Sequence, residues 1–281
     1  MPFCDKCQKK TKHHRVVSRP SYSCDYCGHH VHPTANTIFH KSPTPLTTWF
    51  YATYLMASTR CGISAKQIER ETGVTYKTAW RMFKQIRSML EEEINPLGGP
   101  GSKGVEMDES YFGTKRKRGN KRGRPSAADS SKQCVIGVVE RKGRVVALTS
   151  DNATRTNLHS IAKERILPAS TVFTDEWTGY YGLESKGYTH KRINHAEKVY
   201  VISDGTDKIH TQTIDGFWSL VKNGIRGVYH SVGKGYLQTY LNEYSFRYNR
   251  RHDEQPMFIS FMKQIEKNDA VIRSNIPTEV F

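Results

Sequence analysis

The chain has 281 residues, of which 36% are hydrophobic and 11% aromatic. This length predicts two or three folding units, and this apolar fraction is enough for at least one substantial core. No apolar run is long enough to cross a membrane and the start has no signal-peptide core, which argues against a membrane-spanning or secreted protein and predicts a soluble, intracellular one.

The charge is strongly basic, with 43 Lys and Arg against 27 Asp and Glu and a formal net charge of +16. Such an excess attracts polyanions through counterion release and long-range steering. Nucleic acid is therefore the expected partner, and a basic protein of another function, such as a ribosome-associated one, is the alternative.

Four of the six cysteines form two Cys-x-x-Cys pairs near the start of the chain. Cys4 and Cys7 make the first pair and Cys24 and Cys27 the second, with 16 residues between the pairs. In a reducing compartment this layout indicates metal ligation rather than disulfides, because two such pairs complete a tetrahedral site for one structural Zn²⁺. We therefore predict a zinc ribbon over residues 1–40 that depends on the metal for folding, with a redox pair as the alternative.

Residues 41–96 are predicted to be helical. A run of apolar residues at helical spacing extends from Thr44 to Ser58, and "SAKQIERETGVTYKTAWRMFKQI" follows as a helix, a turn at Gly73 and a second helix that begins near Thr75. This pattern is typical of a helix-turn-helix, whose second helix can enter a major groove, although helical hairpins also occur without DNA. The residues predicted to face the groove are Tyr76, Lys77, Thr78 and Arg81.

Residues 103–270 alternate between predicted strands and helices, which indicates an α/β core. "VEMDESYFG" and "STVFTDEWTGY" are expected strands, and "QCVIGVVERKGRVVALTS" is expected to double back as a hairpin at Lys142-Gly143. Residues 114–132 are predicted to form a basic loop that contacts DNA phosphates, with a solvated tail as the alternative. Its basic residues are Lys115, Arg116, Lys117, Arg118, Lys121, Arg122 and Arg124.

Three aspartates occupy comparable places in this core. Asp108 lies in or just after a strand, Asp175 at the end of a later strand, and Asp215 near the start of an amphipathic helix. Hard divalent cations need oxygen ligands, and two ions about 3.5–4 Å apart need a bridging carboxylate. From these residues alone, a shared metal site and unrelated surface acids are both open. Strand alternation would direct Glu109 and Glu176 away from such a site, and we assign them no metal role.

Five runs occur in this order between residues 105 and 251: "VEMDESYFGTK", "FTDEWTGYYGL", "INHAEKVYV", "HTQTIDGFWSLVKNGIRGVYH" and "YLNEYSFRYNRR". Together with the cysteine pairs ahead of them, they resemble DDE-superfamily insertion-sequence transposases of the zinc-ribbon-bearing, ISXO-like group. The resemblance implies an α/β fold with an RNase H-like (retroviral-integrase-like) catalytic core, preceded by the zinc ribbon and the helix-turn-helix-type region.

The resemblance also implies an activity, namely DNA strand cleavage and strand transfer with two Mg²⁺ or Mn²⁺ ions. Asp108, Asp175 and Asp215 would then hold the metal ions, and Lys222 would neutralise phosphate charge near the scissile bond. His195, His210 and His230 lie in the matched runs, either as residues that orient DNA or a carboxylate or as core histidines.

The match departs from the family at the last helix, where Gln212 and Asp215 replace the usual Asn and Glu. Aspartate is one methylene shorter than glutamate but is still a hard oxygen ligand, so the site can accept it if the helix lies closer. Two other functions stay open. One is a transposase-derived DNA-binding protein that has lost catalysis through these changes, and the other is a zinc-ribbon transcription factor without enzymatic ancestry.

The implied partners are double-stranded DNA, as both terminal inverted repeats and target, and further copies of the chain in a homodimer or higher oligomer on DNA. No membrane partner is expected, and the expected location is the prokaryotic cytoplasm, at the nucleoid.

Overall fold

The computed structural model of the chain describes residues 1–92, 95–113, 132–193, 202–204 and 207–267. The basic residues predicted to contact phosphate between positions 115 and 124, and His195, lie outside these ranges. Within the described ranges, no helix combines the length and the apolar character that a membrane span requires.

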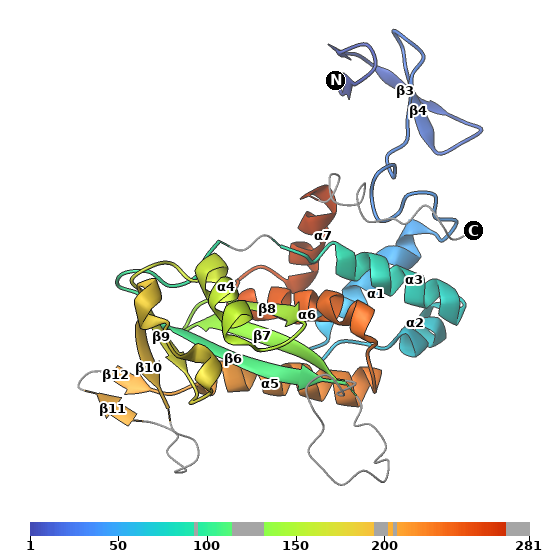
Figure 1. Cartoon of the computed structure of the whole chain (residues 1–281). Helices are drawn as coiled ribbons and strands as arrows, with labels where there is room; N and C mark the ends of the chain where they lie inside the picture. The colour runs from blue at the N-terminus through green and yellow to red at the C-terminus, as the bar shows by residue number, and fades with distance from the viewer. Residues whose placement is uncertain (93–94, 114–131, 194–201, 205–206, 268–281) are drawn as a thin grey trace.

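The first residues form a small β unit that lies away from the rest of the molecule (Figure 1). Strands β1 (Phe3–Cys4) and β2 (Lys9–Lys10) pair antiparallel, and β3 (His13–Val16), β4 (Ser21–Cys24) and β5 (His30–Val31) form a three-stranded antiparallel sheet. Most of its side chains are exposed. A unit with so little buried surface needs a crosslink or a metal to stay folded.

Three helices follow: α1 (Leu46–Ser58), α2 (Ala65–Thr72) and α3 (Tyr76–Ser88). The side chain of Ser64 caps α2 by accepting from the amide of Gln67, and Thr75 caps α3 in the same way. Gly73 ends α2 in the left-handed conformation with φ of 72°, which favours glycine. These caps confirm the predicted pair of helices and the turn between them.

The helices share one core with the end of the chain. Helices α6 (Lys234–Asn249) and α7 (Met257–Lys267) contribute Phe246 and Phe261 to the same apolar cluster as Trp49 and Phe83. Beside it, the buried carboxylate of Glu243 on α6 accepts hydrogen bonds from Arg87 Nε at 2.7 Å and Arg247 Nη2 at 2.8 Å. Helix α6 is thereby fixed to α3 by paired charges as well as by packing.

The centre of the molecule is a mixed five-stranded sheet in the order β10-β9-β6-β7-β8. Strands β6 (Val105–Phe112), β7 (Gln133–Glu140) and β8 (Val145–Ser150) are antiparallel, while β9 (Thr171–Thr174) and β10 (Thr189–Arg192) continue the sheet parallel to β6. Lys142, with φ of 64°, lies in the tight connection of β7 to β8, which confirms the predicted hairpin. The second predicted strand is shorter than "STVFTDEWTGY", since β9 ends at Thr174.

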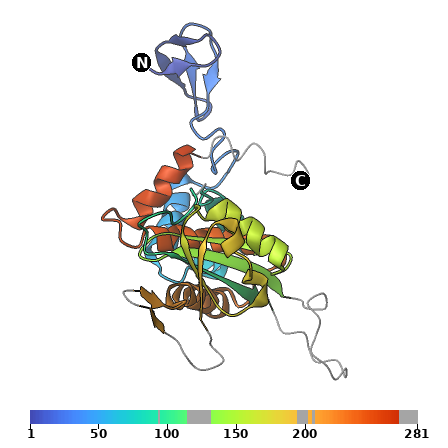
Figure 2. The same cartoon turned by 60° about the vertical axis from the view of Figure 1, so that its left-hand side comes forward.

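Helices cover both faces of this sheet (Figure 2). Helix α4 (Arg155–Arg165) packs Leu158 and Ala162 on one face against Val105 and Met107 of β6. Helix α5 (Gln212–Gly224) lies on the other face with α6, where its apolar stripe meets Val135 and Val139 of β7. Because side chains alternate along β6 and β7, these strands contribute to two separate cores, one on each face of the sheet.

Shorter elements complete the chain. They are the 3₁₀ turns Thr178–Tyr180 and Glu184–Lys186, the hairpin of β11 (Ile202–Asp204) with β12 (Asp207–Ile209), and a π-helical turn at Ile225–Tyr229 that follows α5 directly. The described fold is therefore mixed α/β, as the alternating pattern predicts.

Candidate functional site

Asp108 lies in β6, the central strand of the sheet, on the face that α5 covers. Its Oδ2 accepts a hydrogen bond from Trp218 Nε1 of α5 at 2.8 Å. Gly137 is the β7 residue opposite Asp108, and a Cβ there would lie 2.5 Å from the Trp218 ring. Glycine at this position therefore makes room for the indole that holds the carboxylate.

Asp175 directly follows β9, the parallel neighbour of β6. The register pairs Val105 with Val172 and Glu106 with Phe173. The same offset continued by two residues sets Asp175 beside Asp108, and adjacent strands lie about 4.8 Å apart. The Asp175 carboxylate accepts the amide of Trp177 at 3.0 Å, which fixes the turn that ends the strand.

Asp215 lies in the first turn of α5 and is exposed, as is Gln212. Its backbone amide donates to the carbonyl of Thr211, and the Thr211 hydroxyl donates to Asp215 Oδ2 at 3.4 Å. Lys222 is seven residues further on, about 10.5 Å along the helix axis. The opposite stripe of α5 is buried, which confirms the predicted amphipathic helix.

The pKa of Asp108 is affected by the other acids around it. Burial raises the pKa of Asp108 from 3.8 to about 7. Repulsion from Glu109, Asp175 and Asp215 adds to this effect, while the hydrogen bond from Trp218 lowers the pKa. The charges of Asp175 and Asp215 thus both act on Asp108. Among the described residues, the four N-terminal cysteines are the group of three or more His, Cys, Asp or Glu side chains whose ligand atoms all lie within 4.8 Å of one another, and the aspartates are not that close.

Glu109 belongs to the other face of β6. Its carboxylate accepts a 2.6 Å hydrogen bond from the hydroxyl of buried Tyr180, which packs in the core under α4. Burial raises the pKa of Glu109, and the Tyr180 hydrogen bond opposes that shift. Glu176 is exposed beyond the end of β9. Glu109 therefore influences Asp108 by its charge from the α4 side of the sheet.

Glu106 is a functional candidate that the sequence pattern does not single out. It is fully buried two residues before Asp108, and Oε2 accepts the backbone amides of Thr213 at 2.8 Å and Ile214 at 3.0 Å. Its other oxygen accepts Arg141 Nε at 2.8 Å and lies 3.1 Å from His210 Nδ1. A carboxylate at this position satisfies the orphan amides of α5 and interacts favourably with the helix dipole.

Arg141 completes this arrangement. Its guanidinium donates to the carbonyl of His210 at 2.6 Å and lies over the ring of Phe173, 3.6 Å from the centroid. Residues of β6, the end of β7, β9 and α5 are thereby joined around one buried ion pair. The signal in the sequence is a charged residue between the apolar residues Val105 and Met107 at the start of a strand, which must find a partner once it is buried.

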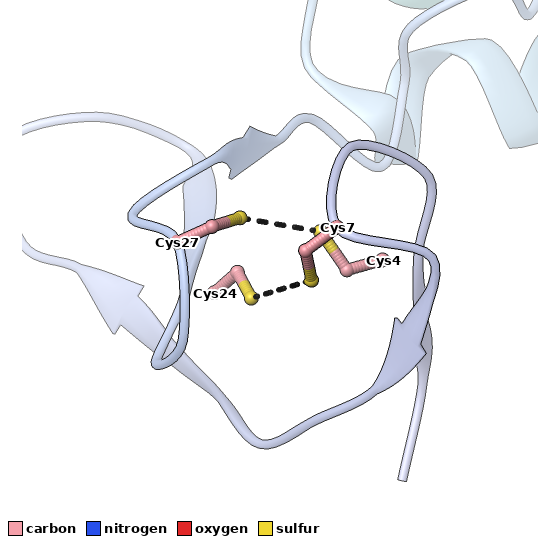
Figure 3. A group of neighbouring side chains, drawn as sticks. All are labelled: Cys4, Cys7, Cys24 and Cys27. Carbon is pink, nitrogen blue, oxygen red and sulfur yellow. Dashed lines mark hydrogen bonds between the residues drawn. The ribbon is translucent and has the colours of Figure 1, made fainter.

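The four N-terminal cysteines form a candidate metal centre (Figure 3). Cys4 and Cys27 Sγ are 3.7 Å apart, Cys7 and Cys24 Sγ are 3.9 Å apart, and none of the four is in a disulfide. Tetrahedral zinc with bonds of about 2.3 Å requires sulfurs about 3.8 Å apart. The donor set and its spacing are therefore compatible with one Zn²⁺.

The residues predicted to face a DNA groove are not equivalent in the structure. Tyr76 and Lys77 are exposed at the start of α3. The backbone amide of Thr78 donates to the side chain of Thr75, the residue that caps α3. Arg81 instead points back toward the preceding segment and donates to Ser42 Oγ at 3.0 Å. The start of α3 is thus the part that is open to a partner.

Comparison with known proteins gives a consistent result. The domain description of ISXO2-like transposases matches residues 97–249. An uncharacterized protein in transposable element ISH50 of Halobacterium salinarum is 26% identical over 261 residues, which cover 87% of this chain and 84% of that protein. An uncharacterized transposase-like protein of Haemophilus influenzae is 27% identical over 130 residues, which cover 46% of this chain and 99% of that one. The matched domain contains Glu106 and all three aspartates.

The cysteine centre predicts a zinc content. The purified full-length chain should contain about one equivalent of zinc, and Cys24→Ser should lose most of it because three thiolates leave a structural site open. Elemental analysis measures this, and Cys61→Ser, which alters an exposed cysteine outside the cluster, should keep the metal. Less than half an equivalent in the unaltered protein would contradict the assignment.

The raised pKa of Asp108 predicts that its ionised carboxylate lowers the stability of the folded protein. Asp108→Asn can still accept from Trp218 but removes a crowded negative charge, so it should stabilise the protein above pH 7 by roughly 1–3 kcal/mol. Because the pKa is raised on folding, the unaltered protein loses this stability as the pH rises from about 4 to about 7. Thermal unfolding without added divalent cation should therefore show a gain for Asp108→Asn that shrinks as the pH falls through that window.

The matched control is Asp151→Asn, which alters an exposed aspartate in the loop after β8. A gain for Asp108→Asn that does not change between pH 5 and pH 8 would show that the side chain does not titrate as we infer.

The buried ion pair predicts a large stability effect at Glu106. Glu106→Gln should destabilise the protein by about 3–5 kcal/mol, since Arg141 would be buried beside a neutral partner. Glu164→Gln, which alters an exposed pair with Arg165, should change stability by less than about 1 kcal/mol. Urea unfolding of the two variants checks the difference, and equal effects would show that the Glu106 carboxylate is not structurally special.

Proposed function

This chain belongs to the family of ISXO2-like transposases, and from that membership we propose that it cuts the ends of an insertion sequence and joins them to target DNA. The matched domain covers residues 97–249, the part of the chain that contains the sheet and α5. The reaction is phosphodiester cleavage followed by strand transfer, and double-stranded DNA is the substrate at both steps.

The observation that carries this proposal is the placement of the three aspartates. Asp108 lies on β6, Asp175 directly follows the parallel neighbour β9, and Asp215 lies on the helix that covers the same face. The charges of Asp175 and Asp215 both repel that of Asp108. Repelling carboxylates gathered from three elements are stabilised by a bound cation and have little other reason to be together. A helix-covered mixed sheet with acids on its central strand also supports an RNase H-like core.

The donor set fits hard divalent cations, Mg²⁺ or Mn²⁺, because all three side chains offer carboxylate oxygens. Two ions held there would supply Lewis-acid activation of the attacking group and stabilise charge on the phosphate oxygens. Trp218 contributes by holding the Asp108 carboxylate in one orientation through its indole N–H. Lys222, on the same helix as Asp215, is suited to neutralise phosphate charge beside the acids.

The short side chain of Asp215 is compatible with this role because of how α5 is held. The carboxylate of Glu106 accepts the amides of Thr213 and Ile214, so the first turn of α5 is fixed against the strand that carries Asp108. A helix start anchored this close to the strand lets an aspartate serve where relatives of the group use a glutamate. Gln212 precedes the anchored amides and can offer a neutral amide oxygen.

DNA contacts are assigned to positive and aromatic groups outside the acids. Tyr76 and Lys77 at the exposed start of α3 are suited to a groove, and the sequence between positions 115 and 124 is suited to phosphates. Zn²⁺ at the four cysteines would hold the N-terminal unit together as a further DNA-binding element. A homodimer or higher oligomer on the paired element ends, in the nucleoid of a prokaryotic cell, completes the proposal.

The test is a series of substitutions at Asp215 and Gln212, the two positions of the site where this chain departs from the residues usual in the family. Asp215→Ala should abolish cleavage of a terminal-repeat duplex in Mg²⁺ while DNA binding persists, since binding and chemistry use different groups. Asp215→Glu should keep or raise activity, and Gln212→Ala should lose less activity than Asp215→Ala because a neutral amide is the weaker metal ligand.

Asp253→Ala, which alters an exposed aspartate far along the chain, is the matched control and should cleave normally. Unchanged cleavage by Asp215→Ala would remove Asp215 from the site. DNA binding without any cleavage by the unaltered protein would favour the transposase-derived DNA-binding protein instead.

A further inference from the structure

A pocket of about 360 Å³ opens where the end of β6 meets the turn between α5 and α6. Its sheet side is formed by the last residues of β6 and the first residue of β7. Its helix side is formed by the chain from the end of α5 to the start of α6. The lining residues that matter for binding are Gln133, Lys222, Arg226, His230 and Lys234.

The charge of this pocket has one sign. Lys222, Arg226 and Lys234 are cations, and no acidic residue is among the described residues that line the pocket. Helix α6 begins at Lys234 and has no side-chain cap, so the positive end of a 16-residue helix adds to the same field. The pocket is therefore suited to an anion.

The backbone around the pocket is built in an uncommon way. The chain passes through the π-helical turn Ile225–Tyr229 and then reaches His230 with φ of 60° and ψ of −45°, a conformation that side chains other than glycine rarely adopt. The ring of Tyr229 holds this turn from behind, packed edge-on against Tyr240 at 4.8 Å and under Arg87 at 5.1 Å. The concave shape is thus fixed by packing, and Arg226 and Lys234 do not themselves maintain it.

The pocket lies on the same helix and strand as two of the aspartates. Lys222 lies about 10.5 Å along α5 from Asp215, and Phe112 lies about 13 Å along β6 from Asp108. One strand of a duplex rises about 3.4 Å per step along the duplex axis, and its winding lengthens the path between phosphates, so the pocket is within about two to four steps of the acids. In the sequence, its lining residue Gly113 is also two residues before Lys115, the start of a stretch in which seven of ten residues are basic.

We propose that this pocket binds one backbone phosphate of the DNA strand that enters the acidic site, through Arg226 and Lys234 with His230 beside them. This inference rests on the proposed function, and it adds the point at which the strand is held next to the chemistry. Contacts to phosphate fix the register of a protein on DNA without reading its sequence. The pocket would therefore set which phosphodiester lies at the aspartates.

The test combines protein variants with single neutral phosphates. A terminal-repeat duplex carries one methylphosphonate at successive positions outward from the cleaved bond, and equilibrium binding is measured for the unaltered protein, Arg226→Ala and Lys234→Ala. Each variant should bind the unmodified duplex about tenfold more weakly, the effect of one charge-assisted hydrogen bond. The slope of log affinity against log salt should fall by about 0.9 for each phosphate contact removed.

The decisive result is that the effects of the pocket variants and of the methylphosphonate are coupled at one position of the duplex. At a position about two to four steps from the cleaved bond, the methylphosphonate should weaken binding of the unaltered protein but should weaken Arg226→Ala and Lys234→Ala no further. Lys163→Ala is the matched control, because Lys163 is exposed on α4 across the sheet, and it should keep the full sensitivity.

Other outcomes overturn the inference in distinguishable ways. If the loss of affinity caused by each variant multiplied with the loss caused by the methylphosphonate at every position, the pocket would hold no phosphate, although the chain would still bind DNA. Saturable binding of inorganic phosphate to the pocket, without coupling in the scan, would assign it to a small anion. Failure of the unaltered protein to bind the terminal-repeat duplex would refute the proposed function and this inference with it.

Discussion

The buried carboxylate of Glu106 is the interaction on which the arrangement of this molecule depends. A charge without solvent contact is tolerated only when it is paired and its oxygens are fully hydrogen-bonded. Arg141 pairs with Glu106, and the backbone amides of Thr213 and Ile214 in the first turn of α5 donate to its other oxygen. Since this carboxylate stands two residues before Asp108, the same strand that presents the first aspartate also fixes the helix that presents the third.

A second constraint is the space around Asp108. The indole of Trp218 reaches the carboxylate only because the facing residue of β7 is glycine, and a side chain at Gly137 would displace the helix. Anchoring by Glu106 at the helix start and by Trp218 one turn later leaves α5 little freedom to move along the sheet. The acids are thereby held together despite mutual repulsion, and the pKa of Asp108 near 7 is the mark of that tension. Functional sites often retain such locally unfavourable arrangements.

Helix α6 connects the parts of the molecule that face a partner. Its first residue lines the cationic pocket, Tyr236 in its first turn packs edge-on against Trp80 of α3 at 5.4 Å, and Glu243 further along pairs with Arg87 of α3. Helix α6 thereby joins the helical layer to the sheet through aromatic, ionic and apolar contacts. A DNA held by α3 would therefore be presented to the pocket and the acids by a rigid support and not by a flexible linker.

The sequence by itself determined the features that depend on neighbouring residues. The spacing of Cys4, Cys7, Cys24 and Cys27 indicated their cluster, the turn at Gly73 and the helix start near Thr75 followed from local conformational preference, and apolar periodicity located α5. The recurrence of five motifs led to the family. Only the tertiary structure decided that Glu106 caps α5, that Arg81 turns to Ser42, and that a π-helical turn shapes a cationic pocket. These contacts join residues as far as 108 positions apart, and no local propensity encodes which distant partner will satisfy a buried charge or fill the space above a glycine.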